Sequence, residues 1–140
     1  MLDPLWSTEA VEIEHDAVVP REHKVEAIAG RPEALEALYV CFRHGSRVGN
    51  CGVCEKCVGT ALMLKMAGAL ERCPTMPALT PDIVRKTSLG PPWVPTFERL
   101  RAAESDVEFR RAITHALRTS ALRRRVHPVA ELARRMRRAH

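Results

Sequence analysis

The fold of this chain is decided by residues 50–57, which read NCGVCEKC. Three cysteines, Cys51, Cys54 and Cys57, follow one another at three-residue steps, and Cys41 lies upstream across a glycine-containing loop. A structural zinc ion takes four ligands at tetrahedral corners, and thiolates are among its preferred ligands. The spacing therefore predicts one structural Zn²⁺ held by Cys41, Cys51, Cys54 and Cys57.

The residues between the cysteines support this interpretation. Gly52 permits a tight turn that points the sulfurs of Cys51 and Cys54 toward one centre. We expect a helix to begin at Val58, and the free N–H groups at its start would stabilise the Cys57 thiolate. Lys56 would offset part of the negative charge of four thiolates. Because four cysteines leave no open position for water, the site is predicted to be structural and not catalytic.

Two other ligand sets compete with this one. The C-x2-C-x2-C pattern also occurs in ferredoxins, so an iron–sulfur cluster is the alternative cofactor. Cys73-Pro74 lies too far along the chain to complete the ferredoxin motif directly, but Cys73 could be recruited to such a cluster. His44, inside the cysteine loop, is the weaker candidate to replace one thiolate. Cys73 is interpreted as a free thiol outside the site.

The rest of the sequence predicts a mainly α, small helical domain with a four-cysteine zinc knuckle, at most one short strand near residues 11–14, and a basic helical C-terminal end. The division expected is a zinc-knuckle helical domain over 1–89, an extended Pro-rich linker over 90–95, and a basic helical segment over 96–140. Spacing predicts helices over 21–29, 32 to about 39 and 58–70, then one over 81–86 with Thr80 as its N-cap and one that ends near 104 with Thr96 as its N-cap. A further helix is expected to begin after a cap formed by Ser105 or Asp106, and a last one near Pro128.

Charge is distributed unevenly along the chain. Residues 109–140 contain ten arginines, no lysine and one glutamate, a net charge of +9, whereas the whole chain carries +5. Arginine side chains suit phosphate, so this end is a candidate nucleic-acid or acidic-protein contact, although an ordinary solvated helix face is the preferred interpretation. The candidate contacts are Arg123, Arg124, Arg125, Arg134, Arg135, Arg137 and Arg138.

The run from residue 41 to residue 57 resembles the C-terminal zinc motif of 7-cyano-7-deazaguanine synthases and related PP-loop ATPase-like proteins. In that family a cysteine is followed, after a loop of similar length, by C-G-x-C-x-x-C, and the four cysteines bind zinc. Residues 3–5 and 21–26 are also similar to segments that precede the first cysteine. The chain lacks the family's Ser-Gly-Gly-x-Asp-Ser loop for ATP, so the resemblance implies the zinc module and not the nitrile-forming reaction.

Three functions remain open at this point. The first is a structural zinc-binding module, a truncated or stand-alone relative of a PP-loop ATPase-like enzyme that serves a separate catalytic chain and is not catalytic alone. The second is a nucleic-acid-binding zinc protein that uses the arginine-rich C-terminal helices, and the third is part of an ATP-dependent nucleobase-modifying enzyme. No apolar run approaches the roughly 20 residues that span a bilayer, and no signal-peptide pattern is present, so we expect a cytoplasmic protein without a membrane partner.

Overall fold

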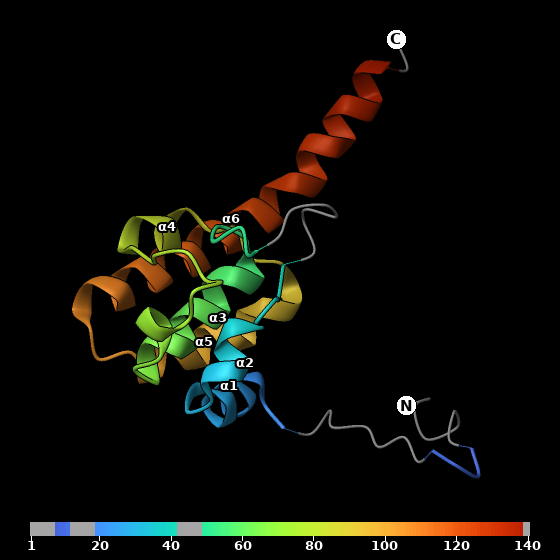
Figure 1. Ribbon diagram of the computed structural model, residues 1–140. Helices are drawn as coiled ribbons and strands as arrows, with labels where there is room; N and C mark the ends of the chain where they lie inside the picture. The colour runs from blue at the N-terminus through green and yellow to red at the C-terminus, as the bar shows by residue number, and fades with distance from the viewer. Residues whose placement is uncertain (1–7, 12–18, 42–48, 139–140) are drawn as a thin grey trace.

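The structure is a computed structural model that describes residues 8–11, 19–41 and 49–138, with side chains described only as far as residue 124. Within these ranges the chain is helical and contains no strand, which confirms the predicted fold class (Figure 1). The elements in chain order are α1 (Arg21–Ala29), α2 (Pro32–Glu36), α3 (Glu55–Met66), the 3-10 turn η2 (Leu70–Arg72), α4 (Pro81–Lys86), the 3-10 turn η3 (Pro91–Trp93), α5 (Val94–Ala103) and α6 (Val107–Arg138). The strand expected near residues 11–14 falls mostly outside the described residues, and Val11 itself is exposed.

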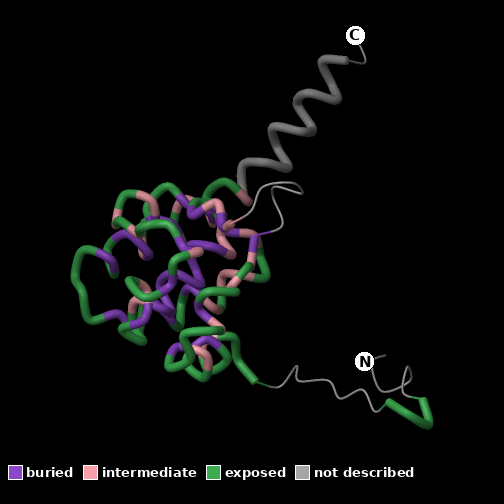
Figure 2. Tube along the Cα trace, in the orientation of Figure 1, coloured by how far each residue is buried: buried purple, intermediate pink, exposed green. Residues whose placement is uncertain are grey.

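Helix α3 runs through the centre of the body, where the buried residues gather in Figure 2. Every residue from Cys57 to Leu64 is buried, so this helix is covered on all its sides and not only along one stripe. It packs against α1 and α5, while α4 and α5 pack against α6. The core thus forms around the helix that carries the last of the four predicted zinc ligands.

Gly59 permits the closest approach of two segments in this core. A β-carbon at this position would lie 2.8 Å from Cζ3 of Trp93 and 3.3 Å from Cε2 of Phe97, which is closer than side chains normally pack. The Trp93 and Phe97 rings meet edge to face, with centroids 6.3 Å apart. Glycine therefore lets η3 and α5 lie directly on the backbone of α3.

The ends of α3 differ from the predicted bounds of 58–70. The helix begins at Glu55 because the Cys54 side chain accepts a hydrogen bond from the Cys57 amide and caps it. It ends at Met66 because Gly68 adopts the left-handed conformation, with φ of +63°. The amides of Gly68 and Ala69 then bond the carbonyls of Lys65 and Leu64, which is the Schellman pattern of a helix end.

Two predicted caps are confirmed and one is wrong. The Thr80 hydroxyl accepts a hydrogen bond from the Ile83 amide at the start of α4, and Asp106 accepts bonds from the amides of Glu108 and Phe109 at the start of α6. Thr96 is not a cap, because α5 already begins at Val94. The second helix also ends earlier than predicted, at Glu36.

The segment over 90–95 is not the extended linker that its prolines suggested. Prolines suit the first turn of a helix, and here they form η3 and lead directly into α5. The start of this segment is anchored by two hydrogen bonds. The Leu89 amide donates to Ser120 Oγ at 2.9 Å, and the Gly90 amide donates to Glu55 Oε2 at 2.5 Å. A single hydrophobic core draws residues from both sides of this segment.

The two basic helices predicted near the C-terminus are one continuous helix, α6. Pro128 removes one backbone hydrogen bond but does not end it. The stretch before it, residues 118–127, contains no glycine or asparagine that would favour a stop, and its Ala, Leu and Arg residues are strong helix formers. Within the described part of the chain, no helix is both long and apolar enough to cross a membrane.

A buried carboxylate pairs α3 with the turn between α5 and α6. The Glu104 carboxylate is only 2% exposed, and its Oε1 lies 3.1 Å from Lys65 Nζ and accepts a hydrogen bond from the Asp106 amide at 3.0 Å. The Lys65 ammonium also lies over the Phe109 ring, 4.4 Å from its centroid. Removing the cation would leave a buried carboxylate without its counter-charge, which is costly.

We therefore expect Lys65→Met to lower the free energy of unfolding by about 2 kcal/mol, because the methionine keeps the packing of the stem but not the charge. Chemical denaturation measures this change. The matched control is Lys86→Met, which breaks the fully solvated pair between Lys86 and Asp82 and should leave stability unchanged. Equal effects of the two substitutions would contradict the assignment of Lys65–Glu104 as a structural pair.

Candidate metal centre

The four predicted cysteines converge on one point. The Sγ atoms of Cys41, Cys51, Cys54 and Cys57 all lie within 4.8 Å of one another. The Sγ atom of Cys57 is 3.7 Å from that of Cys51 and 3.4 Å from that of Cys54. Zinc–sulfur bonds of about 2.3 Å at tetrahedral angles place neighbouring sulfurs about 3.8 Å apart. The cluster therefore has the dimensions needed to hold one metal ion.

Burial shields the cluster from solvent on most sides. Cys41 and Cys57 are fully buried, and Cys54 is nearly so, while Cys51 is half-buried. All five cysteines of the chain are free thiols, so none of the four is tied up in a disulfide. Such a protected, reduced set of thiols is suited to a permanently held ion.

The turn from Cys51 to Cys54 depends on its glycine. Gly52 has φ of +72°, which favours glycine over any other residue. Space excludes a side chain as well, because a β-carbon on Gly52 would lie 3.0 Å from Cβ and Cγ of Pro77. Conformation and packing together explain why this position is glycine in the predicted motif.

The start of α3 delivers the other two ligands. Cys54 is the N-cap of the helix and Cys57 lies in its first turn, and the Cys57 amide donates to Cys54 Sγ at 3.5 Å. The positive end of the helix dipole therefore faces the sulfurs, as the sequence predicted. The carboxylate of Glu55, also in the first turn, accepts a hydrogen bond from the Gly90 amide and so connects the cysteine cluster to the start of η3.

Asn50 holds the two ligand-bearing segments together, a role that the sequence analysis missed. Its Oδ1 accepts a hydrogen bond from the Val40 amide at 2.9 Å, and its Nδ2 donates to the carbonyls of Leu38 at 2.9 Å and Thr75 at 3.1 Å. Asn50 precedes Cys51 in the chain, and Val40 precedes Cys41. This one buried amide thus fixes the backbone beside both ligands.

Side chains at the end of η2 and in the loop after it support the same region. Thr75 Oγ1 donates to the Leu38 carbonyl at 2.7 Å, and the buried Cys73 thiol donates to the Leu35 carbonyl at 3.3 Å. Arg72 donates to the Ala29 carbonyl at 3.0 Å. These side chains satisfy carbonyl groups at and beyond the ends of α1 and α2. Cys73 is outside the cluster, in agreement with its predicted place outside the site.

Without a metal, the thiols differ in acidity. Burial raises the pKa of Cys57 and of Cys54 above the usual value for a thiol. Burial also acts to raise the pKa of Cys51, but hydrogen bonds from the backbone of Val53 and Cys54 outweigh it and lower this pKa to about 6. At neutral pH, Cys51 is the first sulfur ready to bind a cation, and Cys54 and Cys57 must lose protons to follow.

Of the arginines predicted to contact phosphate at the C-terminal end, the structure describes the side chains of Arg123 and Arg124. Arg123 is exposed, whereas Arg124 donates to the Leu89 carbonyl at 3.1 Å and so helps to anchor the segment before η3. The side chains of Arg125, Arg134, Arg135, Arg137 and Arg138 lie outside the described residues, as does His44.

Comparison with known proteins identifies no relative of this chain. The chain matches no family model, no curated protein and no solved structure. We therefore infer function from the geometry of the cysteine cluster and from the physical chemistry of its thiols.

We expect Asn50→Ala to lower the affinity for zinc at least tenfold, because partners that orient metal ligands from outside typically contribute 10- to 100-fold. Competition with a chelator of known affinity measures this loss. Val53→Ala is the matched control, since Val53 lies in the same turn with its side chain 55% exposed and should bind zinc normally. Unchanged affinity in Asn50→Ala would show that the amide does not position the ligands.

Zinc binding should weaken as the pH falls. The raised pKa values of Cys54 and Cys57 mean that both thiols are protonated in the metal-free protein near neutral pH, so binding releases at least two protons. The apparent affinity should then fall at least ~100-fold between pH 8 and pH 7, and more steeply below pH 6, where Cys51 also becomes protonated. Chelator competition across this range tests the slope, and a pH-independent affinity would contradict it.

Proposed function

We propose that this chain is a structural zinc-binding module, in which Zn²⁺ joins the segment ending at Cys41 to the turn and helix that carry the other three cysteines. The observation that carries this proposal is the convergence of the four sulfurs within 4.8 Å. Four thiolates fill all tetrahedral positions, so the ion would stabilise the fold and would not bind a substrate. The module is accordingly proposed to be non-catalytic as an isolated chain.

Zinc is proposed over an iron–sulfur cluster because of the size of the site. A cluster of several iron and sulfide ions holds its cysteine sulfurs farther apart than one ion does, since the inorganic core lies between them. Sulfur separations of 3.4 and 3.7 Å suit a single tetrahedral ion. Zinc is the common ion for a closed four-cysteine site of this kind.

We further propose that the module is related to the C-terminal zinc part of 7-cyano-7-deazaguanine synthase-like, PP-loop ATPase-like proteins. The support is the spacing of Cys41, Cys51, Cys54 and Cys57, together with the glycine after Cys51. The ATP-binding loop of those enzymes is not present in this sequence, so the proposal covers the module and leaves the nitrile-forming reaction to the enzymes themselves. The partner proposed is a separate catalytic chain or an acidic protein surface.

Metal analysis of the purified protein, combined with one substitution, tests this function. We expect one zinc per chain and no visible colour, and we expect Cys54→Ser to lose the zinc and lower the melting temperature by roughly 10 °C or more, since structural zinc supplies much of the folding free energy of a small domain.

Cys73→Ser provides the control, because serine keeps a donor for the Leu35 carbonyl and Cys73 lies outside the cluster. This variant should retain a full complement of zinc. The proposal would be overturned by iron with visible absorption, or by a Cys54→Ser protein that keeps both its metal content and its melting temperature.

A further inference from the structure

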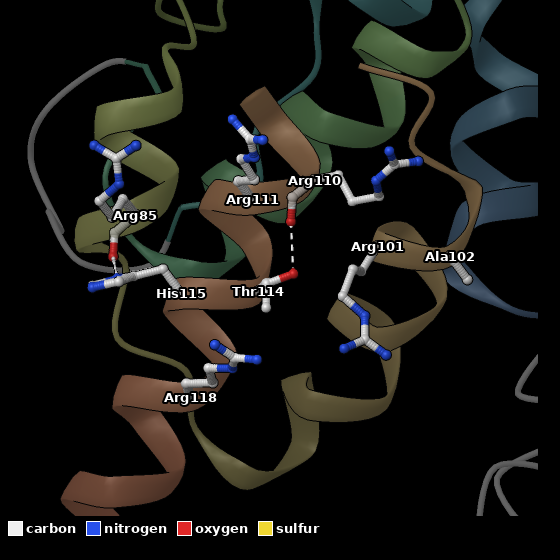
Figure 3. A pocket seen from close by; sticks show the side chains of 8 residues that line it. All are labelled: Arg85, Arg101, Ala102, Arg110, Arg111, Thr114, His115 and Arg118. Atoms are coloured by element: carbon white, nitrogen blue, oxygen red, sulfur yellow. Dashed lines mark hydrogen bonds between the residues drawn. The ribbon is translucent and has the colours of Figure 1, made fainter. Parts of the chain in front are cut away.

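A second candidate site lies on another part of the molecule, between α4, α5 and α6. An open hollow of about 590 Å³ is lined by arginines from three different helices, as Figure 3 shows. We call it the arginine hollow, and its basic residues are Arg85, Arg101, Arg110, Arg111, His115 and Arg118. No acidic residue is among those that line it.

The positive charge of the arginine hollow is largely uncompensated. Arg85 lies 3.8 Å from Asp82, but both side chains are solvated, and such exposed pairs are weak. Among the described residues, Arg101, Arg111 and Arg118 form no ion pair with an acid. Several guanidinium groups crowded together repel one another, and a bound anion would relieve this repulsion.

The arginines are held on rigid elements. α4 and α6 pack closely, and the His115 ring meets the Arg85 carbonyl at 3.3 Å across their contact. Thr114 Oγ1 donates to the Arg110 carbonyl at 2.8 Å within α6, as the dashed line in Figure 3 marks. The cationic side chains thus project from a fixed framework and not from a loop.

The spacing of the charges suits an extended ligand. Arg111, His115 and Arg118 follow at steps of four and three on one face of α6, so they cover about 10 Å along the helix axis. Arg85 and Arg101 widen the charged area across α4 and α5. A lone phosphate would need converging donors in a closed pocket, whereas a polymer with a phosphate at every unit matches an open area of separated guanidinium groups.

We propose that the arginine hollow binds the phosphate backbone of a nucleic-acid duplex. The arginine fork bonds phosphate oxygens in pairs, and all five long basic side chains of the hollow are arginine. The lining includes no Phe, Tyr or Trp, and the ring of His115 contacts the Arg85 carbonyl, so the hollow lacks the large aromatic platforms on which unpaired bases stack. Contacts made only to phosphate carry no sequence information, so binding is independent of base sequence.

This site differs from the C-terminal arginines considered from the sequence. It includes Arg85 and Arg101, which lie outside the strongly basic C-terminal region, and it is formed only when α4 and α5 pack on α6. It also makes no use of the cysteine cluster, so it stands independently of the proposed zinc function.

The test measures binding of the full-length protein to a fluorescent 24-base-pair duplex of mixed sequence by anisotropy, between 50 and 200 mM salt. We expect the logarithm of the affinity to fall linearly with the logarithm of salt concentration. Arg111→Gln combined with Arg118→Gln should weaken binding at least tenfold and reduce the magnitude of the salt slope by about 2, because two phosphate contacts are lost.

The matched control removes the same charge elsewhere. Arg21→Gln combined with Arg31→Gln changes two exposed arginines outside the hollow and should leave the affinity within about twofold of the unmodified protein. Zinc content and melting temperature are measured on the same samples. Zinc content should be unchanged in both double variants, and the control should melt slightly lower because Arg21→Gln removes the cation–π contact with Trp93. A failure of the duplex-binding test can then be distinguished from a failure of the zinc-binding test.

Four results would overturn the proposal. They are an absence of duplex binding at 50 mM salt, equal affinity of the two double variants, tighter binding to a single strand than to the duplex, and binding of polyglutamate as tight as that of the duplex. The last result would assign the surface to an acidic protein instead.

Discussion

The convergence of four sulfurs on one point constrains where every neighbouring segment can lie. Three of the sulfurs come from one turn and the helix that follows it, while Cys41 comes from the chain that leaves α2. Metal coordination would therefore fix the distance between α2 and the start of α3, a distance that apolar packing alone leaves adjustable. Since α3 is buried on all sides, fixing its first turn also fixes the helix around which α1 and α5 pack.

Hydrogen bonds from uncharged side chains also hold this arrangement together. Asn50 bridges the backbones beside Cys41 and Cys51, and Thr75 accompanies it at the Leu38 carbonyl. These bonds reduce the conformational freedom that the sulfurs would otherwise lose on binding, so more of the coordination energy remains as affinity. The arginine hollow is held together differently. There, helices packed on the apolar core keep positive charges close to one another although these charges repel.

Parts of this structure were predictable from the sequence because their causes are local. The cysteine spacing identified the four-cysteine cluster, Arg21–Ala29 follows its helical pattern, and Thr80 and Asp106 cap helices with their own side chains. The end of α3 was predicted at residue 70 and lies at Met66, although Gly68 marks it with a local signal. The anchoring of residues 89–90 was not, because it depends on Glu55, Ser120 and Arg124, which lie more than thirty residues away. The Asn50 bridge and the arginine hollow likewise exist only after distant segments meet.

The bond between Glu55 and the Gly90 amide has a consequence for observing this molecule in solution. It joins the first turn of α3, which carries Cys57, to the segment that leads into α5. An amide proton exchanges with solvent only when its hydrogen bond opens, and local opening varies widely across one structure. The Gly90 proton is thus a natural reporter: its exchange rate would record, at a residue outside the cysteine cluster, how firmly that cluster is held closed.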